Sequence, residues 1–292
     1  MNRPVPSPNS PPRLGAGLTL RIGAAIALMA LMGACQQSNK ARAATLALLE
    51  PGLEYGALTV PQQDSDTPTT VHVLRFEPTR FTLAAVQAAE TGAALADAHA
   101  FRIARGAIAA INGGYFDPQY KPLGLLVSGG KQLYRLRKVD HGIFQIADRK
   151  PALQHAQHFN KPKWLEFALE CGPRLVVAGK PLSFKPGVNR RTVLAHDGAG
   201  RVLMLASAGV ISLTDLTSWL VKPPSAGGLG VVAALNLDGG SSTMFELAHD
   251  KAQAAIHSPI RVPIGVALMR RPAAAQAASV AVPQDPTAQD RE

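Results

Sequence analysis

Short apolar runs separated by turn-forming residues fill the chain between about residue 46 and residue 270. Runs of about four to eight residues that are rich in β-branched and other apolar side chains, and bounded by Gly, Pro, Asn or Asp, are typical of strands. The sequence Asp-Gly-Ala-Gly at residues 197–200 links two such runs and predicts a tight hairpin. The predicted strands cover residues 70–76, 81–86, 106–111, 143–146, 174–177, 192–195, 201–206, 231–237 and 262–269.

Two segments instead have apolar side chains at helical intervals. Residues 91–105 are rich in alanine and predict one helix. Residues 213–221 predict the other, because Thr214 and Asp215 suit a helix start and Pro223 follows its end. Many strands and few helices predict an α+β fold, with a mixed, mainly antiparallel sheet in a single domain.

The first 35 residues follow a different pattern. A basic start precedes an apolar run at residues 22–34, which is shorter than the roughly 20 residues of a membrane span but suits an export signal. Its end, Leu-Met-Gly-Ala-Cys at residues 31–35, resembles the lipobox of bacterial lipoproteins. We expect residues 1–35 to be a lipoprotein signal peptide, with Cys35 lipidated. An ordinary secretory signal followed by an incidental cysteine is the alternative.

The predicted anchor sets the expected organisation of the remaining chain. Residues 36–45 are polar and predict a tether, residues 46–270 form the domain, and residues 271–292 predict a disordered tail. Such a protein is exported and held by its lipid on the periplasmic side of a bacterial membrane, in the cell envelope. If Cys35 is lipidated, Cys171 is the only other cysteine and no intramolecular disulfide can form.

Charge narrows the classes of partner. The formal net charge is +10, yet the basic residues are scattered and no nucleic-acid-binding motif occurs, so we expect no nucleic-acid partner. A positively charged surface on an exported protein suits phosphate-bearing lipids or glycans as partners. A solvated surface that has no particular partner is the equally weighted alternative. We expect no cofactor and no metal site, because two histidines, His155 and His158, are too few ligands. The alternative is a divalent cation bound by acidic side chains.

Two strands end in similar glycine turns, at residues 109–116 and 233–245. Glycine permits positive φ angles and close approach of other groups, and successive amides in such turns can bind anions. The alternative is that both are sharp turns whose Asn and Asp satisfy local backbone donors. The turns contain Asn112, Gly113 and Gly114 in the first, and Asp238, Gly239, Gly240, Ser241 and Ser242 in the second.

Four ordered blocks, at residues 107–131, 171–180, 190–205 and 234–245, resemble the phosphodiester glycosidase family. Its namesake, the mammalian uncovering enzyme, removes N-acetylglucosamine from a phosphodiester on mannose. The similarity spans roughly residues 70–269, and it implies an α+β catalytic domain whose pocket is walled by the two glycine turns. Carried over position by position, the family pattern matches both turns, and also Arg191 with Thr192. The chain departs from the pattern at Ala195, where the family usually has Gly.

The resemblance leads to a hypothesis about mechanism. A phosphate monoester has a second pKa of about 6 and can leave as an anion with little acid help, unlike the alkoxide of an ordinary glycoside. We expect Arg191 to clamp the phosphate, helped by amides of the turns, and Asp238 to act as base or as partner of the oxocarbenium ion. Asn112 would orient a sugar hydroxyl or a phosphate oxygen. Further candidates for substrate binding are Thr192, Tyr115, Asp117 and His196.

The predicted function is that of an envelope hydrolase that cleaves a sugar-1-phosphodiester bond in a glycan or glycolipid. The retained Asn112, Arg191 and Asp238 favour this reading. The altered strand at Ala195 and His196 instead favours the alternative, a non-catalytic glycan-binding or scaffold lipoprotein of the envelope.

Overall fold

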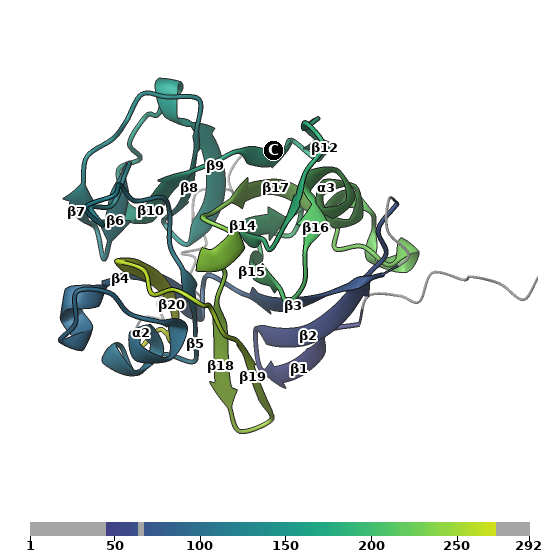
Figure 1. Cartoon of the computed structure of the whole chain (residues 1–292), viewed down its shortest axis with the longest axis horizontal. Coiled ribbons are helices and arrows are strands. Elements are labelled where there is room, and N and C mark those ends of the chain that lie inside the picture. The colour runs from purple at the N-terminus through teal and green to yellow at the C-terminus, as the bar shows by residue number, and fades with distance from the viewer. Residues whose placement is uncertain (1–44, 64–66, 273–292) are drawn as a thin grey trace, which may run out of the picture. The chain divides into compact units, whose positions relative to one another are not determined.

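A computed structural model of the chain describes residues 45–63 and 67–272 (Figure 1). The predicted signal peptide, Cys35, nearly all of the predicted tether, and the predicted tail from residue 273 lie outside the described residues. No helix in the described part of the chain is long and apolar enough to cross a membrane.

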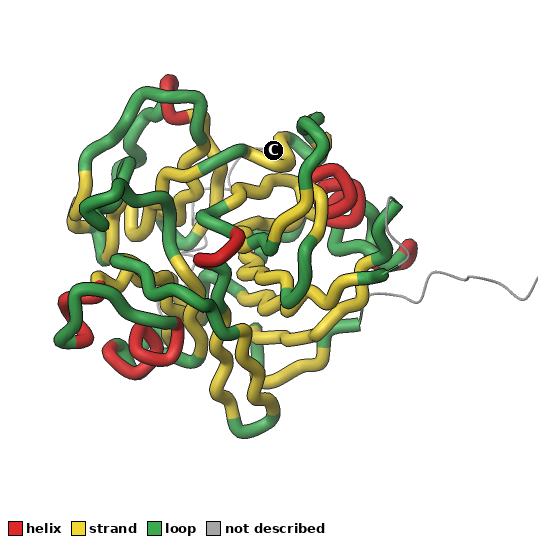
Figure 2. The backbone as a smooth tube through the Cα atoms, viewed as in Figure 1, coloured by secondary structure: helices red, strands yellow, loops and turns green. Residues whose placement is uncertain are grey.

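Three sheets dominate the described residues, and every strand pair in them is antiparallel (Figures 1 and 2). The eight-stranded sheet has the order β1 (Ala47–Glu50), β2 (Leu53–Val60), β3 (Thr69–Phe76), β15 (Val202–Ser207), β14 (Thr192–Asp197), β17 (Val231–Asn236), β11 (Arg174–Val177) and β12 (Lys180–Pro181). One five-stranded sheet has the order β7 (Lys131–Tyr134), β6 (Leu126–Ser128), β10 (Leu165–Cys171), β8 (Gly142–Ala147) and β9 (Lys150–His155). The other has the order β19 (Ala252–Ile256), β18 (Phe245–His249), β5 (Ala109–Asn112), β20 (Ile264–Arg270) and β4 (Phe81–Gln87). A short pair, β13 (Val188–Asn189) and β16 (Ile211–Ser212), stands apart from these sheets.

The described residues contain two α-helices, α2 (Ala98–Ala104) and α3 (Leu213–Val221), and the second has the predicted bounds. The prediction of one helix over residues 91–105 is wrong in its first half. Gly92 has a φ of 80°, and Ala96 forms a β-bridge, so the helix begins only after Asp97, whose carboxylate accepts from the Ala100 amide at 2.9 Å. The 3₁₀ turns are η1 (Ala88–Thr91), η2 (Ala156–His158), η3 (Pro224–Ala226) and η4 (Gly240–Ser242).

All nine predicted strands are present, eight of them with shifted ends, but the described residues hold more strands than the sequence predicts. The fold is therefore richer in β-structure than a balanced α+β protein, and its sheets are antiparallel rather than mixed. The missed strands are short edges, such as β12, or carry polar residues that hide their pattern. β10 is an example, because Glu166 and Glu170 interrupt its apolar run.

A continuous apolar core lies between the three sheets and fixes where their strands end. Side chains such as Phe144, Phe167 and Phe245, which come from different strands, are fully or almost fully buried in it. Helix α3 packs Trp219 and neighbouring residues on the other face of the eight-stranded sheet. Because close-packed interiors resist displacement, the strand ends at the edge of this core are held firmly. Both glycine turns lie at such ends.

Candidate functional site

The two glycine turns lie against each other. The first follows β5 and the second follows β17, more than a hundred residues later in the chain. The Asp238 amide donates to the Gly113 carbonyl at 3.3 Å, and the Gly113 amide donates to the Ile264 carbonyl at 2.9 Å. The first of these bonds joins strand ends from two different sheets, so the turns form one connected wall.

Asn112 ties this wall together. It is fully buried, and its Nδ2 donates to the Asp238 carbonyl at 2.7 Å and to the Gly113 carbonyl at 3.3 Å. Its Oδ1 accepts from the Thr192 hydroxyl at 2.7 Å and from the Met244 amide at 3.2 Å. These four contacts use both donors and both lone pairs of the amide. Asn112 is therefore a positioning residue here and leaves no group for a sugar hydroxyl, and the buried Thr192 is committed to it in the same way.

The second turn needs its glycines for two different reasons. A Cβ on Gly239 would lie 2.8 Å from the Arg190 carbonyl oxygen, and Gly240 has a φ of 62°. The Gly240 amide donates to that same Arg190 carbonyl at 2.8 Å, and the Gly239 amide donates to Asp238 Oδ1 at 2.9 Å. The amides of Gly113, Gly239 and Gly240 all have protein acceptors, so these three do not form the anion-binding nest that the sequence predicts.

The carboxylate of Asp238 stays at the edge of solvent. Burial raises the pKa of Asp238 above its ordinary value, while hydrogen bonds from the Ser242 hydroxyl and the Gly239 amide partly oppose that rise. Ser242 is buried in the turn, whereas Ser241 is exposed. The turn therefore holds an acid that is harder to ionise than a carboxyl in water, which suits exchange of a proton.

Arg191 and Tyr115 approach the same place. Burial raises the pKa of Tyr115 well above its usual range; the charges of Cys171 and Asp238 also raise it, and that of Arg191 lowers it. The Tyr115 hydroxyl donates to the Gly172 carbonyl at 2.5 Å. The Arg190 and Thr192 carbonyls, on either side of Arg191, accept from the Gly240 and Leu237 amides at 2.8 Å, so Arg191 lies beside the second turn. Its charge and that of Asp238 both act on the Tyr115 hydroxyl.

The guanidinium of Arg191 is held by carbonyl groups. Its Nε donates to Ile211 in β16 at 3.2 Å and its Nη2 donates to Gly187 at 3.3 Å. Burial lowers the pKa of Arg191, and the side chain forms no ion pair with any carboxylate among the described residues. Its positive charge is thus fixed in place and available to an anion.

A second acid–base pair, which the sequence reasoning missed, lies beside Tyr115. Glu170 is 1% exposed, and its Oε2 accepts from the amides of Leu125 at 2.8 Å and Arg137 at 2.9 Å. Its Oε1 faces His141 Nδ1 at 3.5 Å, and the His141 ring lies 5.8 Å from the Tyr115 ring between centroids. The signal in the sequence was the charge of Glu170 inside the apolar run of β10, next to a block of the family pattern.

Buried polar atoms without a hydrogen-bond partner gather in this region. Of the six such side-chain atoms among the described residues, four belong to it. They are His141 Nδ1, Glu170 Oε1, Asn236 Oδ1 and Thr243 Oγ1. Because buried polar groups in native proteins are nearly always paired, this concentration is typical of a functional site.

The structure places the remaining candidates elsewhere. Asp117 accepts from the amides of Gln119 at 2.9 Å and Lys121 at 2.8 Å, so it closes its own turn. His196 lies towards the far end of β14 from Thr192 and packs on Phe144, and burial lowers its pKa. Neither of these two side chains is brought to the two turns.

Cys171 takes little part in this chemistry. Cys171 is fully buried, and burial raises the pKa of its thiol to about 12, so it stays protonated at neutral pH and is a poor nucleophile. In residues 45–63 and 67–272, no group of three or more His, Cys, Asp and Glu side chains is arranged to hold a metal ion.

Known proteins resemble this chain in sequence and in fold. Residues 105–274, more than half of the chain, match the family model described as phosphodiester glycosidase. The fold resembles the catalytic domain of zebrafish N-acetylglucosamine-1-phosphodiester alpha-N-acetylglucosaminidase, auto-inhibited by its pro-peptide. The TM-score is 0.61, with 17% identity over 78% of this chain and 87% of that chain. A hypothetical protein from Synechocystis has a TM-score of 0.52 and 16% identity over 78% of this chain and 64% of that chain.

One curated relative matches over a shorter stretch. The uncharacterized protein YigE of Escherichia coli strain K12 is 32% identical over 79 residues. That match covers 24% of this chain and 31% of YigE, so the chain spans about a third of this relative. The two solved structures, at 17% and 16% identity, establish a shared fold alone.

Proposed function

We propose that this chain, which belongs to the phosphodiester glycosidase family, hydrolyses the bond between a sugar and the phosphate of a glycosyl phosphodiester. The observation that carries the proposal is that the charges of Asp238 and Arg191 both act on the Tyr115 hydroxyl, beside two turns that are bonded to each other. An acid and a fixed guanidinium around one hydroxyl suit a substrate that has an anionic phosphate next to a carbon that gains positive charge.

Arg191 would bind the phosphate. Two of its five N–H groups donate to carbonyls, which orients the guanidinium and leaves the others for phosphate oxygens. The departing phosphate monoester has a second pKa of about 6, so it leaves as an anion with little help from an acid. A fixed positive charge stabilises the negative charge that develops on that leaving group, and this favours the transition state over the bound substrate.

Asp238 would act at the anomeric carbon. A water oxygen forms a bond to this carbon, the bond from the carbon to the phosphate oxygen breaks, and the electron pair leaves with the phosphate monoester. The proton of the water passes to the Asp238 carboxylate. Burial raises the pKa of Asp238, and a carboxylate that holds its proton more tightly is a stronger base.

The His141–Glu170 pair would supply a second proton carrier. A buried carboxylate favours a proton on the facing nitrogen, so Glu170 would keep the proton of neutral His141 on Nδ1 and leave Nε2 as the exchanging atom. The Cδ2 edge of the ring, next to Nε2, lies 3.1 Å from the position of a Cβ on Gly172, whose carbonyl accepts from Tyr115. His141 would thus act beside the Tyr115 hydroxyl, as Asp238 does.

The proposal is tested with the full-length chain and a panel of glycosyl phosphodiesters that differ in sugar and anomeric configuration. Release of the sugar and of the phosphomonoester are both measured. We expect turnover of at least one substrate, and a loss of about 10²- to 10³-fold in kcat/KM for Arg191→Ala. Arg261→Ala removes an exposed guanidinium and serves as the control. Binding without release of either product would favour the alternative, a non-catalytic glycan-binding or scaffold protein.

The role of the His141–Glu170 pair is tested with variants of its own. His141→Asn and Glu170→Gln should each lower kcat by about 10- to 100-fold with little change in KM. The double variant should be no slower than His141→Asn alone, because Glu170 acts through His141. A Glu170→Gln protein that unfolds more easily but keeps its kcat would show that the pair only supports the fold.

We further propose that the substrate is a glycan or glycolipid of the cell envelope. This extension depends on the predicted export signal and on lipidation of Cys35, which both lie outside the described residues. Mass spectrometry of the membrane-associated protein would test it, since a lipidated cysteine at the mature N-terminus is expected. A mature chain that starts elsewhere without lipid would contradict the anchor without affecting the proposed chemistry.

A further inference from the structure

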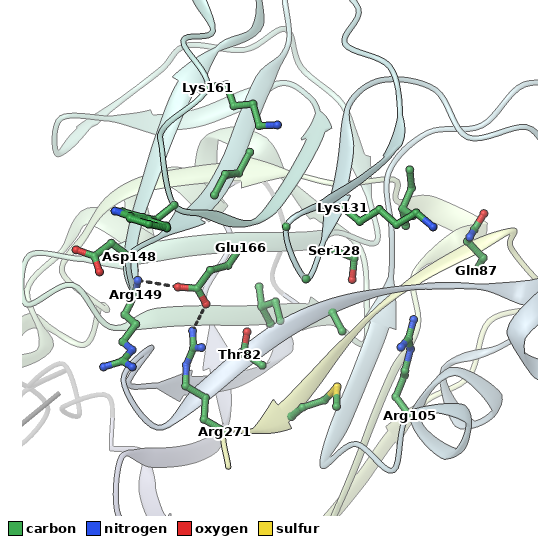
Figure 3. Close-up of a pocket in the computed structure, with 18 of the residues that line it drawn as sticks. Thr82, Gln87, Arg105, Ser128, Lys131, Asp148, Arg149, Lys161, Glu166 and Arg271 are labelled. Atoms are coloured by element: carbon green, nitrogen blue, oxygen red, sulfur yellow. Dashed lines mark hydrogen bonds and ion pairs between the residues drawn. The ribbon is translucent and has the colours of Figure 1, made fainter. Parts of the chain in front are cut away.

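A large groove opens on a part of the molecule that the proposed chemistry does not use (Figure 3). Its volume is about 1250 Å³. It is lined by β4, by the turn between β6 and β7, by the segment that leads into β10, and by the end of β20. Grooves of this size occur mainly at binding sites.

The groove is separate from the two glycine turns. β10 starts in the groove at Leu165 and Glu166 and ends at Cys171, beside the Gly172 carbonyl that accepts from Tyr115. A strand advances by about 3.3 Å per residue, so the two ends of β10 are about 20 Å apart. An occupant of the groove therefore does not touch the proposed reacting groups.

The lining of the groove carries an excess of positive charge. Its basic residues are Arg105, Lys131, Arg149, Lys161, Lys163 and Arg271, and its acidic residues are Glu90, Asp148 and Glu166. Two acids are already neutralised, because Glu90 pairs with Arg105 and Glu166 pairs with Arg271.

Three of these cations have no acidic partner. Lys131, Lys161 and Lys163 form no ion pair with a carboxylate among the described residues. In Figure 3, Lys131 and Lys161 extend from the lining apart from the Glu166–Arg271 pair. A concave surface with unpaired ammonium groups concentrates anions.

The groove also presents an indole to solvent. Trp164 is 63% exposed, which is unusual for so large an aromatic side chain, and the Lys163 ammonium lies 5.0 Å from its ring centroid. The segment that carries it is fixed: the Asp148 amide donates to the Trp164 carbonyl at 3.0 Å, and the Gly130 amide donates to the Glu166 carbonyl at 3.0 Å. The backbone that carries the indole is thus fixed, so less of the chain has to be ordered on binding.

We propose that this groove binds a segment of an anionic glycan, with the Trp164 indole against the apolar face of a sugar ring and the three lysines against its phosphate or carboxylate groups. A neutral glycan would not use the unpaired ammonium groups. A single-stranded nucleic acid is read by several stacking rings, whereas the lining has one aromatic residue among those described. A lipid surface is broad, and this site is concave. The proposal does not depend on the reaction at the glycine turns.

The test uses the full chain and two oligosaccharides of equal length, an oligogalacturonate and a neutral malto-oligosaccharide. Tryptophan fluorescence is a direct readout, because the chain has two tryptophans and Trp219 is buried under α3. We expect the oligogalacturonate to change the Trp164 emission and the neutral probe to bind at least about tenfold more weakly. Equal affinity for both probes would overturn the proposal.

Variants separate the groove from general attraction to a basic protein. The double variant Lys161→Glu with Lys163→Glu should weaken binding of the oligogalacturonate by about tenfold or more. Lys180→Glu with Lys251→Glu changes the net charge equally at exposed positions outside the lining, and it should leave the affinity nearly unchanged. If both pairs weaken binding equally, attraction is non-specific and the proposal fails. Binding by Trp164→Ala, followed calorimetrically, should also be weaker than in the unchanged protein.

The same binding measurements also test other classes of ligand. Tighter binding to oligo(dT), or to vesicles of anionic phospholipid, with the same sensitivity to the groove variants, would overturn the glycan proposal. Turnover of a small glycosyl phosphodiester should be unchanged in the groove variants. That measurement distinguishes failure of the groove proposal from failure of the proposed reaction.

Discussion

The two glycine turns share a sequence pattern but differ in their relation to solvent. In the first turn, Asn112 is fully buried, and four hydrogen bonds, three of them to other parts of the protein, use its whole amide. In the second turn, Asp238 is partly exposed, and the hydrogen bonds that its carboxylate accepts from described residues come from its own turn, from Gly239 and Ser242. The Asn112 side chain therefore holds the two turns together, whereas the Asp238 side chain is partly open to solvent.

The chemical type of each residue accounts for this difference. A neutral amide can be buried at little cost when each of its donors and acceptors has a partner. A carboxylate loses much more solvation free energy on burial, so it is stable only near water or a counter-charge. Asn therefore suits the turn that joins two sheets, and Asp suits the turn that is partly open to solvent. The following predictions test whether Asn112 supports the fold while Asp238 acts in the proposed reaction.

The largest effect is expected at Asp238. Asp238→Asn keeps the size of the side chain and an acceptor for the Gly239 amide, but it removes the base. We expect kcat/KM for a glycosyl phosphodiester to fall by about 10²- to 10⁴-fold while the fold is kept. Activity near that of the unchanged protein would remove Asp238 from the proposed chemistry.

The same variant should be more stable at neutral pH. Burial raises the pKa of Asp238 in the folded state, so ionisation of this side chain favours the unfolded chain, and Asn avoids that penalty. The gain should be present above the folded-state pKa and should disappear as the pH falls below the unfolded-state pKa, where the carboxyl is protonated in both states. Thermal unfolding at several pH values measures this, and a lower Tm at pH 7 would contradict it.

Asn112→Ala should lower the stability of the protein, which is the opposite of the effect expected for Asp238→Asn at neutral pH. Loss of the amide leaves the Thr192 hydroxyl, the Met244 amide and the Asp238 carbonyl without their partner. We expect the free energy of unfolding, measured with urea, to fall by about 2–4 kcal/mol. Thr192→Val removes one of these contacts and should cost less. An Asn112→Ala protein of unchanged stability that has lost its activity would instead make Asn112 a substrate ligand, as the sequence alone predicts.

The contrast between the turns also shows which parts of the site were readable from the sequence. Strands and helices with continuous local patterns were found, and β11 and α3 have the predicted bounds. The pattern of an apolar strand followed by a polar residue and two glycines located both turns. It did not reveal the role of Asn112, because two of its partners, Thr192 and Met244, lie 80 and 132 residues away along the chain.

The His141–Glu170 pair and the groove were missed for the same physical reason. Glu170 interrupts the apolar pattern of β10, but its meaning depends on His141, which reaches it from the segment before another strand. Trp164 and the lysines around the groove have no periodic pattern, since turns and strand ends of two sheets bring them together. Local patterns identify elements, whereas sites depend on contacts between elements.

A smaller effect tests how closely the second turn fits against its neighbour. Gly239→Ala places a Cβ 2.8 Å from the Arg190 carbonyl oxygen, a backbone atom that cannot turn away. We expect a loss of about 1–3 kcal/mol in the free energy of unfolding. Gly198→Ala is the matched control, because its Cβ would meet only Val232 at 3.8 Å. Equal stabilities of the two variants would show that the close approach at Gly239 is not needed.

The smallest effect is expected from Ser242→Ala and concerns pH alone. The Ser242 hydroxyl bonds to the Asp238 carboxylate and lowers its pKa, so its removal should leave that pKa higher. If Asp238 must be ionised to act as base, the acid limb of kcat/KM then moves to higher pH, while the plateau at higher pH changes little. Ser241→Ala, in the same turn but exposed, should leave the limb in place. An acid limb that does not move in Ser242→Ala would belong to another group, and the second turn would then differ from the first in exposure but not in chemistry.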